Sequence, residues 1–160
     1  MIAIRTIQVA TDFSKASGVA LPYGRNLAQA LSAGLHVVHV VDDLAVSTIP
    51  LVPGAADAVH AGPRQAELNA RAQEQIDQAV TTDDRRSLGA KVALLMSHTP
   101  AQAVLSYARD QAMDLIIVGT RGRPEIAQLL LGSVAQQVAR RAPCPVLIVR
   151  EEEHDQIART

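Results

Sequence analysis

Glycine and serine residues in the last third of the chain have the spacing of a phosphate-binding loop. Gly119 and Gly122 are followed, after nine residues, by Gly132 and Ser133. The run Asp114–Val118, apolar after its first residue, predicts a buried strand before the loop, and a helical pattern follows Ser133. Glycines let a backbone approach phosphates closely, and the unpaired N–H groups and dipole at the start of a helix attract anions. A strand, a glycine loop and a helix in this order predict a nucleotide site.

The ends of two further predicted strands carry groups that can contact the same ligand. Ile7–Ala10 predicts the first strand and is soon followed by Asp12, and Leu35–Val41 predicts the second strand. In open parallel sheets a ligand binds beyond the carboxyl ends of the strands, where the strand order reverses. The Asp12 carboxylate either accepts hydrogen bonds from ligand hydroxyls or caps the helix that follows. Asp42 and Asp43 are interpreted as turn caps in preference to metal ligands, so the metal ligands are left unknown.

The rest of the chain alternates between helical and strand patterns. Helical composition covers residues 17–32 and 63–80, and a further helix is expected to begin at Thr99, with a cap hydroxyl followed by proline. Lys91–Met96 and Val146–Val149 predict two more strands. This alternation predicts an α/β fold with a parallel sheet and right-handed crossovers.

Local signals refine two of these segments. In the first helical segment, Pro22 and Gly24 predict a kink or a late start, and Gly34 predicts the C-terminal stop. The charged run Asp83–Arg86 is interpreted as a solvated turn. The buried stripe of the first helix is expected to contain Leu21, Leu27, Ala28 and Leu31.

The composition is that of a globular domain without a nucleic-acid partner. The 160 residues are 48% hydrophobic and 19% charged, so the chain can bury a core and is too apolar to be disordered. A formal net charge of −1 and an aromatic content of 2% provide neither a basic stripe nor a stacking platform. The sequence shows no signal-peptide pattern and no run of about eighteen apolar residues. We therefore expect a cytoplasmic protein that does not associate with membranes.

Several reactive side chains are interpreted as structural. His36 and His39 lie in an apolar run and are expected to be hydrogen-bonded core residues rather than catalytic bases. Cys144 is the only cysteine, lies between two prolines, and is expected to be a packed small residue without an activated thiol. Leu129–Leu131 is interpreted as core or dimer contact.

Taken together, these motifs resemble the universal stress protein family over nearly the whole chain. Ile7–Ser14 is similar to the family's first strand and its Asp-Phe-Ser turn, and Leu35–Asp42 resembles the second strand. The glycine spacing from Gly119 to Ser133, followed by Pro143–Leu147, is similar to the signature of the family's ATP-binding branch. The full spacing with this ending is far more specific than a lone pair of glycines.

The resemblance implies a Rossmann-like five-stranded parallel sheet of order 3-2-1-4-5, with helices on both faces. It also implies a homodimer formed through the last strand, Val146–Val149. That strand has an apolar edge, which natural sheets usually cover or pair. We expect residues 1–150 to form one nucleotide-binding domain and residues 151–160 to form a mobile charged tail.

Carried over to this chain, the family's ligand contacts fall on three strand ends and on the start of the last helix. Asp12 would lie near the ribose, Val40 beside the adenine, and Gly119 beside the ribose and the first phosphate. Arg121 and Arg123 are added because a guanidinium at these positions either reaches the outer phosphates or is solvated. The complete set of expected nucleotide contacts is Ala10, Thr11, Asp12, Val40, Gly119, Arg121, Gly122, Arg123, Gly132, Ser133 and Val134.

Two departures from known patterns bear on the activity. His98 stands where family members commonly carry a glycine, two residues before Pro100, and the glycine loop lacks the lysine of the P-loop motif. We therefore expect an ATP-binding regulatory or stress-response dimer with slow or no hydrolysis, and the presence of Mg²⁺ beside the ATP is left open. Two alternatives remain: a nucleotide-free interaction module with Leu44–Gly62 as its surface, and a weak Mg-dependent ATPase or adenylyl-transferring enzyme.

Overall fold

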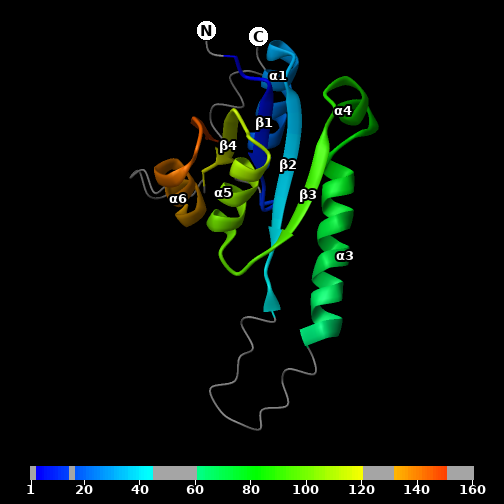
Figure 1. The fold of residues 1–160 in the computed structure, drawn as a ribbon. Coiled ribbons are helices and arrows are strands. Elements are labelled where there is room, and N and C mark those ends of the chain that lie inside the picture. Colours follow the sequence, from blue (N-terminus) through cyan, green and yellow to red (C-terminus); the bar gives the residue numbers. More distant parts are fainter. Residues whose placement is uncertain (1–2, 15–16, 45–60, 121–131, 151–160) are drawn as a thin grey trace.

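A five-stranded, all-parallel sheet lies at the centre of the molecule, with the strand order β3-β2-β1-β4-β5 (Figure 1). This computed structural model describes residues 3–14, 17–44, 61–120 and 132–150. The strand order and the fold class expected from the sequence are both confirmed. The strands are β1 (Thr6–Ala10), β2 (Gly34–Val41), β3 (Lys91–Met96), β4 (Leu115–Gly119) and β5 (Val146–Val149).

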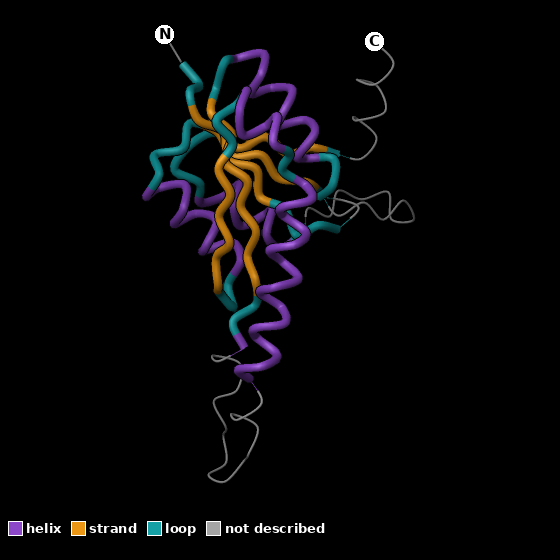
Figure 2. Tube along the Cα trace, turned by 90° about the vertical axis from the view of Figure 1, so that its right-hand side faces the viewer, coloured by secondary structure: helices purple, strands orange, loops and turns teal. Residues whose placement is uncertain are grey.

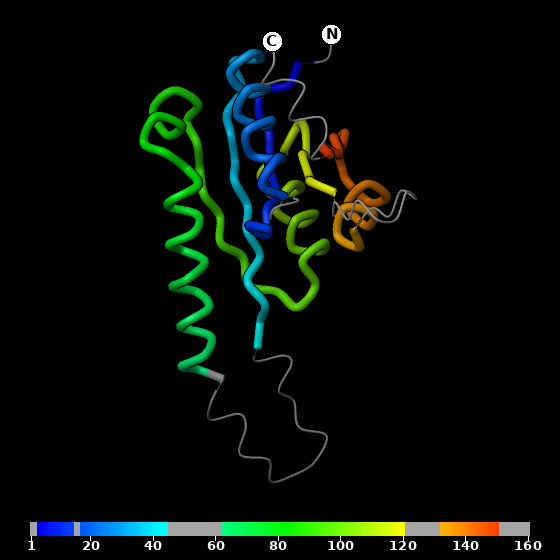
Figure 3. Tube along the Cα trace, turned by 180° about the vertical axis from the view of Figure 1, so that it is seen from behind, coloured from blue at the N-terminus to red at the C-terminus, as the bar shows by residue number. Residues whose placement is uncertain are grey.

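Helices cover both faces of this sheet, as the side view in Figure 2 shows. They are α1 (Ala20–Leu31), α3 (Ala61–Ala79), α4 (Thr82–Ser87), α5 (Pro100–Asp110) and α6 (Ser133–Arg141). Helices α5 and α6 lie in front of the sheet in Figure 1, whereas α1 lies in front of it when the molecule is seen from behind in Figure 3. Among the described helices, none is both long enough and apolar enough to span a bilayer.

The core is divided by the sheet into two apolar clusters. Successive residues of a strand point to opposite faces, so Val37 joins the cluster under α1 and α3 while Ile116 joins the one under α5 and α6. Both faces of the central strands are covered, which explains why these strands are nearly continuous apolar runs. Each face of the sheet therefore has an apolar cluster of its own.

The first helix begins late, as its proline predicted, but it does not end where expected. Pro22 lies in the first turn of α1, where its missing N–H has no intrahelical partner to lose. The helix ends at Leu31, its C-cap residue Ser32 has a left-handed φ of 53°, and Gly34 is already the first residue of β2. The stop predicted at Gly34 is therefore wrong. Leu31 is also wrongly placed in the buried stripe: it is 44% exposed, because the chain turns away toward β2 at the last turn of α1.

The charged run at 83–86 is helical, so its interpretation as a solvated turn is wrong. The Thr81 hydroxyl accepts the N–H of Asp84 at 3.1 Å, and the Asp84 carboxylate accepts the N–H of Thr81 at 2.9 Å, which closes a capping box at the start of α4. The buried carboxylate also accepts hydrogen bonds from Arg25 of α1. Burial alone would raise the pKa of Asp84, but the hydrogen bonds from Arg25 and Thr81 hold it below its usual value. An ion pair between distant parts of the sequence thus fixes α4 to α1.

Helix α5 begins at the proline that predicted it, but the expected cap hydroxyl does not act as a cap. Thr99 is the N-cap residue and makes no side-chain capping bond. Its hydroxyl lies 3.2 Å from the hydroxyl of Ser97 instead, because both side chains stabilise the turn after β3.

Candidate nucleotide site

A cavity of about 220 Å³ lies beyond the carboxyl ends of β1, β2 and β4 and reaches the first residues of α5 and α6. This is the edge of a parallel sheet at which strand order reverses and ligands bind. Its apolar lining consists of Ala10, Val38, Val40, Pro100, Val104, Val118, Val134 and Ala135. Its polar lining, together with two glycines, consists of Thr11, Asp12, Ser14, Ser17, Gly119, Thr120, Gly132 and Ser133.

Eight of the eleven expected nucleotide contacts line this one cavity. They come from the ends of β1, β2 and β4 and from the start of α6, four places distant in sequence that the sheet brings together. The remaining three, Arg121, Gly122 and Arg123, lie outside the described residues, as do Leu129–Leu131 and the tail 151–160. Most of the Leu44–Gly62 segment also lies outside them, and only Leu44 and the start of α3 are described.

Backbone N–H groups at the start of α6 form one wall of the cavity, and they have no hydrogen-bond partner among the described residues. Gly132 is the N-cap residue, and the first intrahelical bond runs from the Gln136 N–H to the Gly132 carbonyl at 3.0 Å. The N–H groups of Ser133, Val134 and Ala135 therefore precede the helical ladder, and all three residues line the cavity. Such unpaired donors at the positive end of a helix dipole attract anions. Ser133 is the first helical residue, and its side chain makes no capping bond to this helix.

The opposite wall presents a carboxylate in a tightly bonded turn. Asp12 Oδ1 accepts the N–H of Ser14 at 3.0 Å and the hydroxyl of Ser17 at 2.6 Å. Partial burial would raise the pKa of Asp12, but these hydrogen bonds outweigh it and hold the pKa below its usual value. Asp12 does not cap α1, whose N-cap residue is Val19. An ionised acceptor therefore stands at the rim of the cavity.

Valine side chains from strands β2 and β4 and from α5 form the floor of the cavity. Val38 and Val40 are two residues apart in β2 and so point to the same face, and Val104 and Val118 complete the apolar surface. Val40 was expected from the family motif. Val38 was not, although the two-residue period of a strand places it beside Val40. Ser17 was not expected either, because its position depends on the shape of the turn.

The histidines and the cysteine have the structural roles expected from the sequence. His36 Nδ1 lies 2.9 Å from the hydroxyl of Tyr107, and His39 Nδ1 lies 2.8 Å from the carbonyl of Thr11. Burial, with a smaller contribution from Lys91, lowers the pKa of His36. Burial also raises the pKa of the Cys144 thiol, so this thiol is not activated. None of these side chains lines the cavity.

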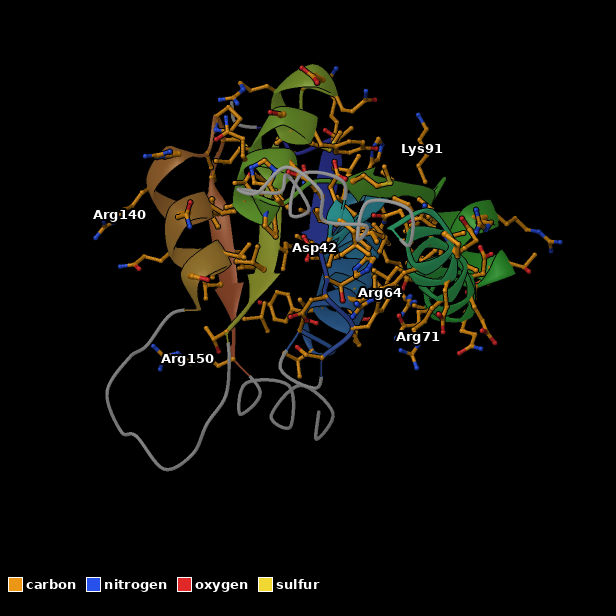
Figure 4. The ribbon with its side chains drawn as sticks, turned by 90° about the horizontal axis from the view of Figure 1, so that it is seen from below. Asp42, Arg64, Arg71, Lys91, Arg140 and Arg150 are labelled. Atoms are coloured by element: carbon orange, nitrogen blue, oxygen red, sulfur yellow. The ribbon has the colours of Figure 1, made fainter. Side chains whose placement is uncertain are left out.

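The described part of the cavity carries a single carboxylate and no basic side chain. Figure 4 shows Arg140 of α6 and Lys91 of β3 extending away from the body of the molecule. Within the described ranges, no three histidine, cysteine, aspartate or glutamate residues come together as a metal site would require. The described lining thus offers backbone donors, hydroxyl groups and one carboxylate for binding, with no acid and base pair around a reacting atom.

Comparison with known proteins decides the family. The model of the universal stress protein family matches residues 3–150 of the chain. This chain belongs to the universal stress protein family. The match confirms the resemblance found in the motifs at Asp12, Val40 and the glycine loop.

Similar universal stress proteins cover nearly the full length of this one. Universal stress protein YxiE of Bacillus subtilis is 29% identical over 143 residues, which span 89% of this chain and 96% of the relative. The structure of universal stress protein UspA from Lactobacillus plantarum matches with a TM-score of 0.75 at 24% identity, covering 92% of this chain and 99% of that chain. A universal stress protein solved in complex with cAMP matches with a TM-score of 0.57 at 29% identity, covering 92% and 98% of the two chains.

One departure of this universal stress protein from the family pattern lies beside the cavity. His98 is exposed in the connection between β3 and α5, and it is not among the lining residues, whereas Pro100 is. The histidine therefore leaves the described walls of the cavity unchanged.

Proposed function

We propose that this universal stress protein binds ATP in the cavity between β1, β2, β4 and α6, and acts as a cytoplasmic, nucleotide-dependent regulatory dimer. One observation carries the proposal: three N–H groups at the start of α6, without a partner among the described residues, lie across one cavity from the Asp12 carboxylate. The donors suit phosphate, and the carboxylate suits hydroxyls of a sugar. A nucleotide carries both groups, joined to a flat apolar base that the valine floor accommodates.

The size and lining of the cavity support a nucleoside as the enclosed part of the ligand. Its volume of about 220 Å³ lies just below the usual range of small-molecule sites, about 300–1,000 Å³. Val38, Val40 and Val104 provide apolar contact for an adenine ring. A universal stress protein at 29% identity was solved in complex with cAMP, which supports an adenine nucleotide as the ligand class.

The dimer is proposed to form through β5. This strand is an edge of the sheet and pairs only with β4 within the described structure. Val146, Leu147 and Ile148 are all only half-buried in the single chain. Pairing with a second copy would cover an apolar edge that natural sheets rarely leave open. Light scattering on the purified chain measures its mass and tests this part of the proposal directly.

Slow or absent hydrolysis is proposed because the described lining holds no general base. Asp12 is already engaged by two donors, and its lowered pKa makes it a weak proton acceptor. Turnover at about 1 per second with Mg²⁺, the ordinary range of enzymes, would replace the regulatory role with an enzymatic one.

Nucleotide binding is tested first on the protein as purified. The protein is denatured, the released small molecules are identified by mass spectrometry, and ATP is titrated calorimetrically into the stripped chain. We expect ATP or ADP in the released fraction and a Kd of roughly micromolar magnitude.

Two glutamate variants on the same helix locate the site. Gly132 has a φ of −54°, which any residue adopts, so Gly132→Glu places a negative charge at the cavity without unusual backbone. The control Gln137→Glu puts the same charge on an exposed residue of α6 outside the cavity. We expect Gly132→Glu to weaken ATP binding more than about thirtyfold and Gln137→Glu to leave it within about twofold. No released nucleotide and no heat with the unaltered chain would instead favour the nucleotide-free interaction module.

A further inference from the structure

The turn after β1 is held in one conformation by its own side chains. Thr11 Oγ1 accepts the N–H of Phe13 at 3.0 Å, and Asp12 Oδ1 accepts the N–H of Ser14 at 3.0 Å. Phe13 has a φ of 57°, a left-handed conformation that is strained for a bulky residue. Its ring packs on His39 with centroids 4.6 Å apart. Strain of this kind persists only where surrounding contacts determine the conformation.

Ser17 lies at the centre of this turn and is almost fully buried, with 9% exposure. Its hydroxyl donates to Asp12 Oδ1 at 2.6 Å, a distance typical of a hydroxyl bonded to a carboxylate. The Ser17 oxygen lies 3.2 Å from Thr11 Oγ1 and accepts the N–H of Asp12 at 3.3 Å. A hydroxyl has one proton and two acceptor positions, so the Thr11 hydroxyl can donate to Ser17 while Ser17 donates to Asp12.

The two carboxylate oxygens of Asp12 differ in their hydrogen bonds. Oδ1 is occupied by Ser14 and Ser17, whereas Oδ2 makes no hydrogen bond within the described part of the chain. The residue lines the cavity and is itself exposed, so Oδ2 is available to a ligand. The carboxylate is thus oriented and ionised before any ligand arrives.

We propose that Ser17 is a positioning residue that holds the Asp12 carboxylate so that Oδ2 accepts the hydroxyl groups of a ribose. This inference rests on the proposed function, because it assigns the sugar specificity of the same cavity. A site built to bond a substrate hydroxyl discriminates strongly against the analogue that lacks it. Ser17 therefore sets the preference for a ribonucleotide over one without sugar hydroxyls, although it contacts the nucleotide only through Asp12.

The first test compares the unaltered chain with Ser17→Ala, using ATP and 2′,3′-dideoxy-ATP in calorimetric titrations. Ser17→Ala is expected to weaken ATP binding about tenfold and to change dideoxy-ATP binding by less than about twofold. An equal loss for the two nucleotides would show a general structural role and overturn the inference. So would an unaltered chain that binds both nucleotides equally well.

A second readout does not depend on nucleotide. The carboxyl carbon of Asp12 is titrated by NMR in the nucleotide-free full chain. Burial acts to raise this pKa and the Ser17 hydrogen bond acts to lower it, so Ser17→Ala is expected to raise it. An unchanged pKa of Asp12 overturns the positioning role. If the unaltered chain binds neither nucleotide, the proposed function and the ribose role both fail, whereas this titration still reports the Ser17–Asp12 contact.

A double-mutant cycle distinguishes a loss of the Ser17–Asp12 contact from a general distortion of the turn in Ser17→Ala. Asp12→Asn keeps the shape of the side chain and removes its charge. If Ser17 acts through Asp12, adding Ser17→Ala to Asp12→Asn causes no further loss of ATP affinity. Fully additive losses from the two substitutions would contradict this.

Discussion

The two faces of the sheet differ in what they bury. Under α1 and α3, the strands contribute apolar side chains such as Ile7, Val9 and Val37 at 0% exposure, and these meet Ile76 of α3, which is equally buried. Under α5 and α6, the sheet buries polar Gln8 and His36 and leaves the cavity open at its end. One face is a dry core, and the other combines a core with a binding site.

This difference shows how one sheet serves stability and binding at once. A face without a ligand can fill all its space with close-packed side chains. A face that binds a nucleotide must keep unpaired donors and empty volume, which do not stabilise the fold. Since neighbouring residues of a strand point to opposite faces, one residue can pack in the core while the next lines the binding site.

The largest effect is expected from overfilling the dry face at Gly24. This glycine lies inside α1, and a Cβ at its position would overlap Cγ2 of the fully buried Val9. A β-branched strand residue cannot move aside easily, so Gly24→Val is expected to destabilise the fold by about 3 kcal/mol. Urea denaturation measures the loss.

Gly62 is the matched control for that substitution. It also lies in a helix, α3, but a Cβ there meets nothing within 4 Å. Gly62→Val is expected to change stability by less than about 0.5 kcal/mol. Similar losses at the two glycines would mean that helix propensity, and not close packing on the sheet, decides the result.

Features that depend on neighbouring residues could be predicted from the sequence, whereas features that depend on contacts between distant residues could not. Lys91–Met96 and Val146–Val149 were predicted with the bounds that the structure shows, because a buried strand is a local pattern of apolar residues. Gly24 was taken for a helix disturbance, although its role is contact with a strand. The helix at Asp84 was missed for the same reason, since its stabilising partner is Arg25 of α1.

The residues that line the candidate site were easier to predict from the sequence than the residues that support them. The rule that ligands bind at strand ends, together with the family motif, led to Asp12, Val40 and Gly132. Ser17 was missed because a serine five residues after an aspartate carries no signal until the turn brings their side chains to 2.6 Å. The strand order itself came from the family resemblance, since periodicity alone leaves several orders possible.

An intermediate effect is expected from the adjacent valines Val37 and Val38 of β2. Both are fully buried, but Val37 joins the dry core whereas Val38 lines the cavity. Val37→Ala leaves a void among packed side chains and is expected to cost about 2 kcal/mol without changing ATP affinity. Val38→Ala enlarges a space that already exists, so we expect a loss of about 1 kcal/mol and weaker ATP binding.

Urea denaturation and ATP titration on both valine variants separate the two faces. The comparison fails if both variants lose stability equally and bind ATP equally well. It also fails if Val37→Ala is the one that loses affinity.

The smallest effect on stability is expected where the binding face buries an unsatisfied polar atom. Gln8 has 0% exposure; its Nε2 donates to the carbonyl of Val104 at 3.1 Å, and its Oε1 has no partner within the described residues. Gln8→Leu removes the orphaned acceptor and buries more apolar surface, while the Val104 carbonyl keeps its place in the helical ladder of α5. The free energy of unfolding is expected to stay within about 1 kcal/mol of that of the unaltered chain. Gln8→Ala, which leaves a void, is expected to cost about 2 kcal/mol.

If Gln8 contributes little to stability, we infer that its role is to hold α5 in position through the bond to Val104. The one hydrogen bond of its side chain among the described residues is to the carbonyl of Val104, which lines the cavity, so Gln8→Leu removes a polar bond between the sheet and α5. The expected consequence is a loss of ATP affinity of about threefold with stability preserved, measured by titration and denaturation on the same preparation. A loss of more than about 2 kcal/mol in stability with unchanged ATP affinity would show that Gln8 stabilises the fold and does not support binding. The binding face would then be held together by its polar contacts, just as the opposite face is held together by its apolar ones.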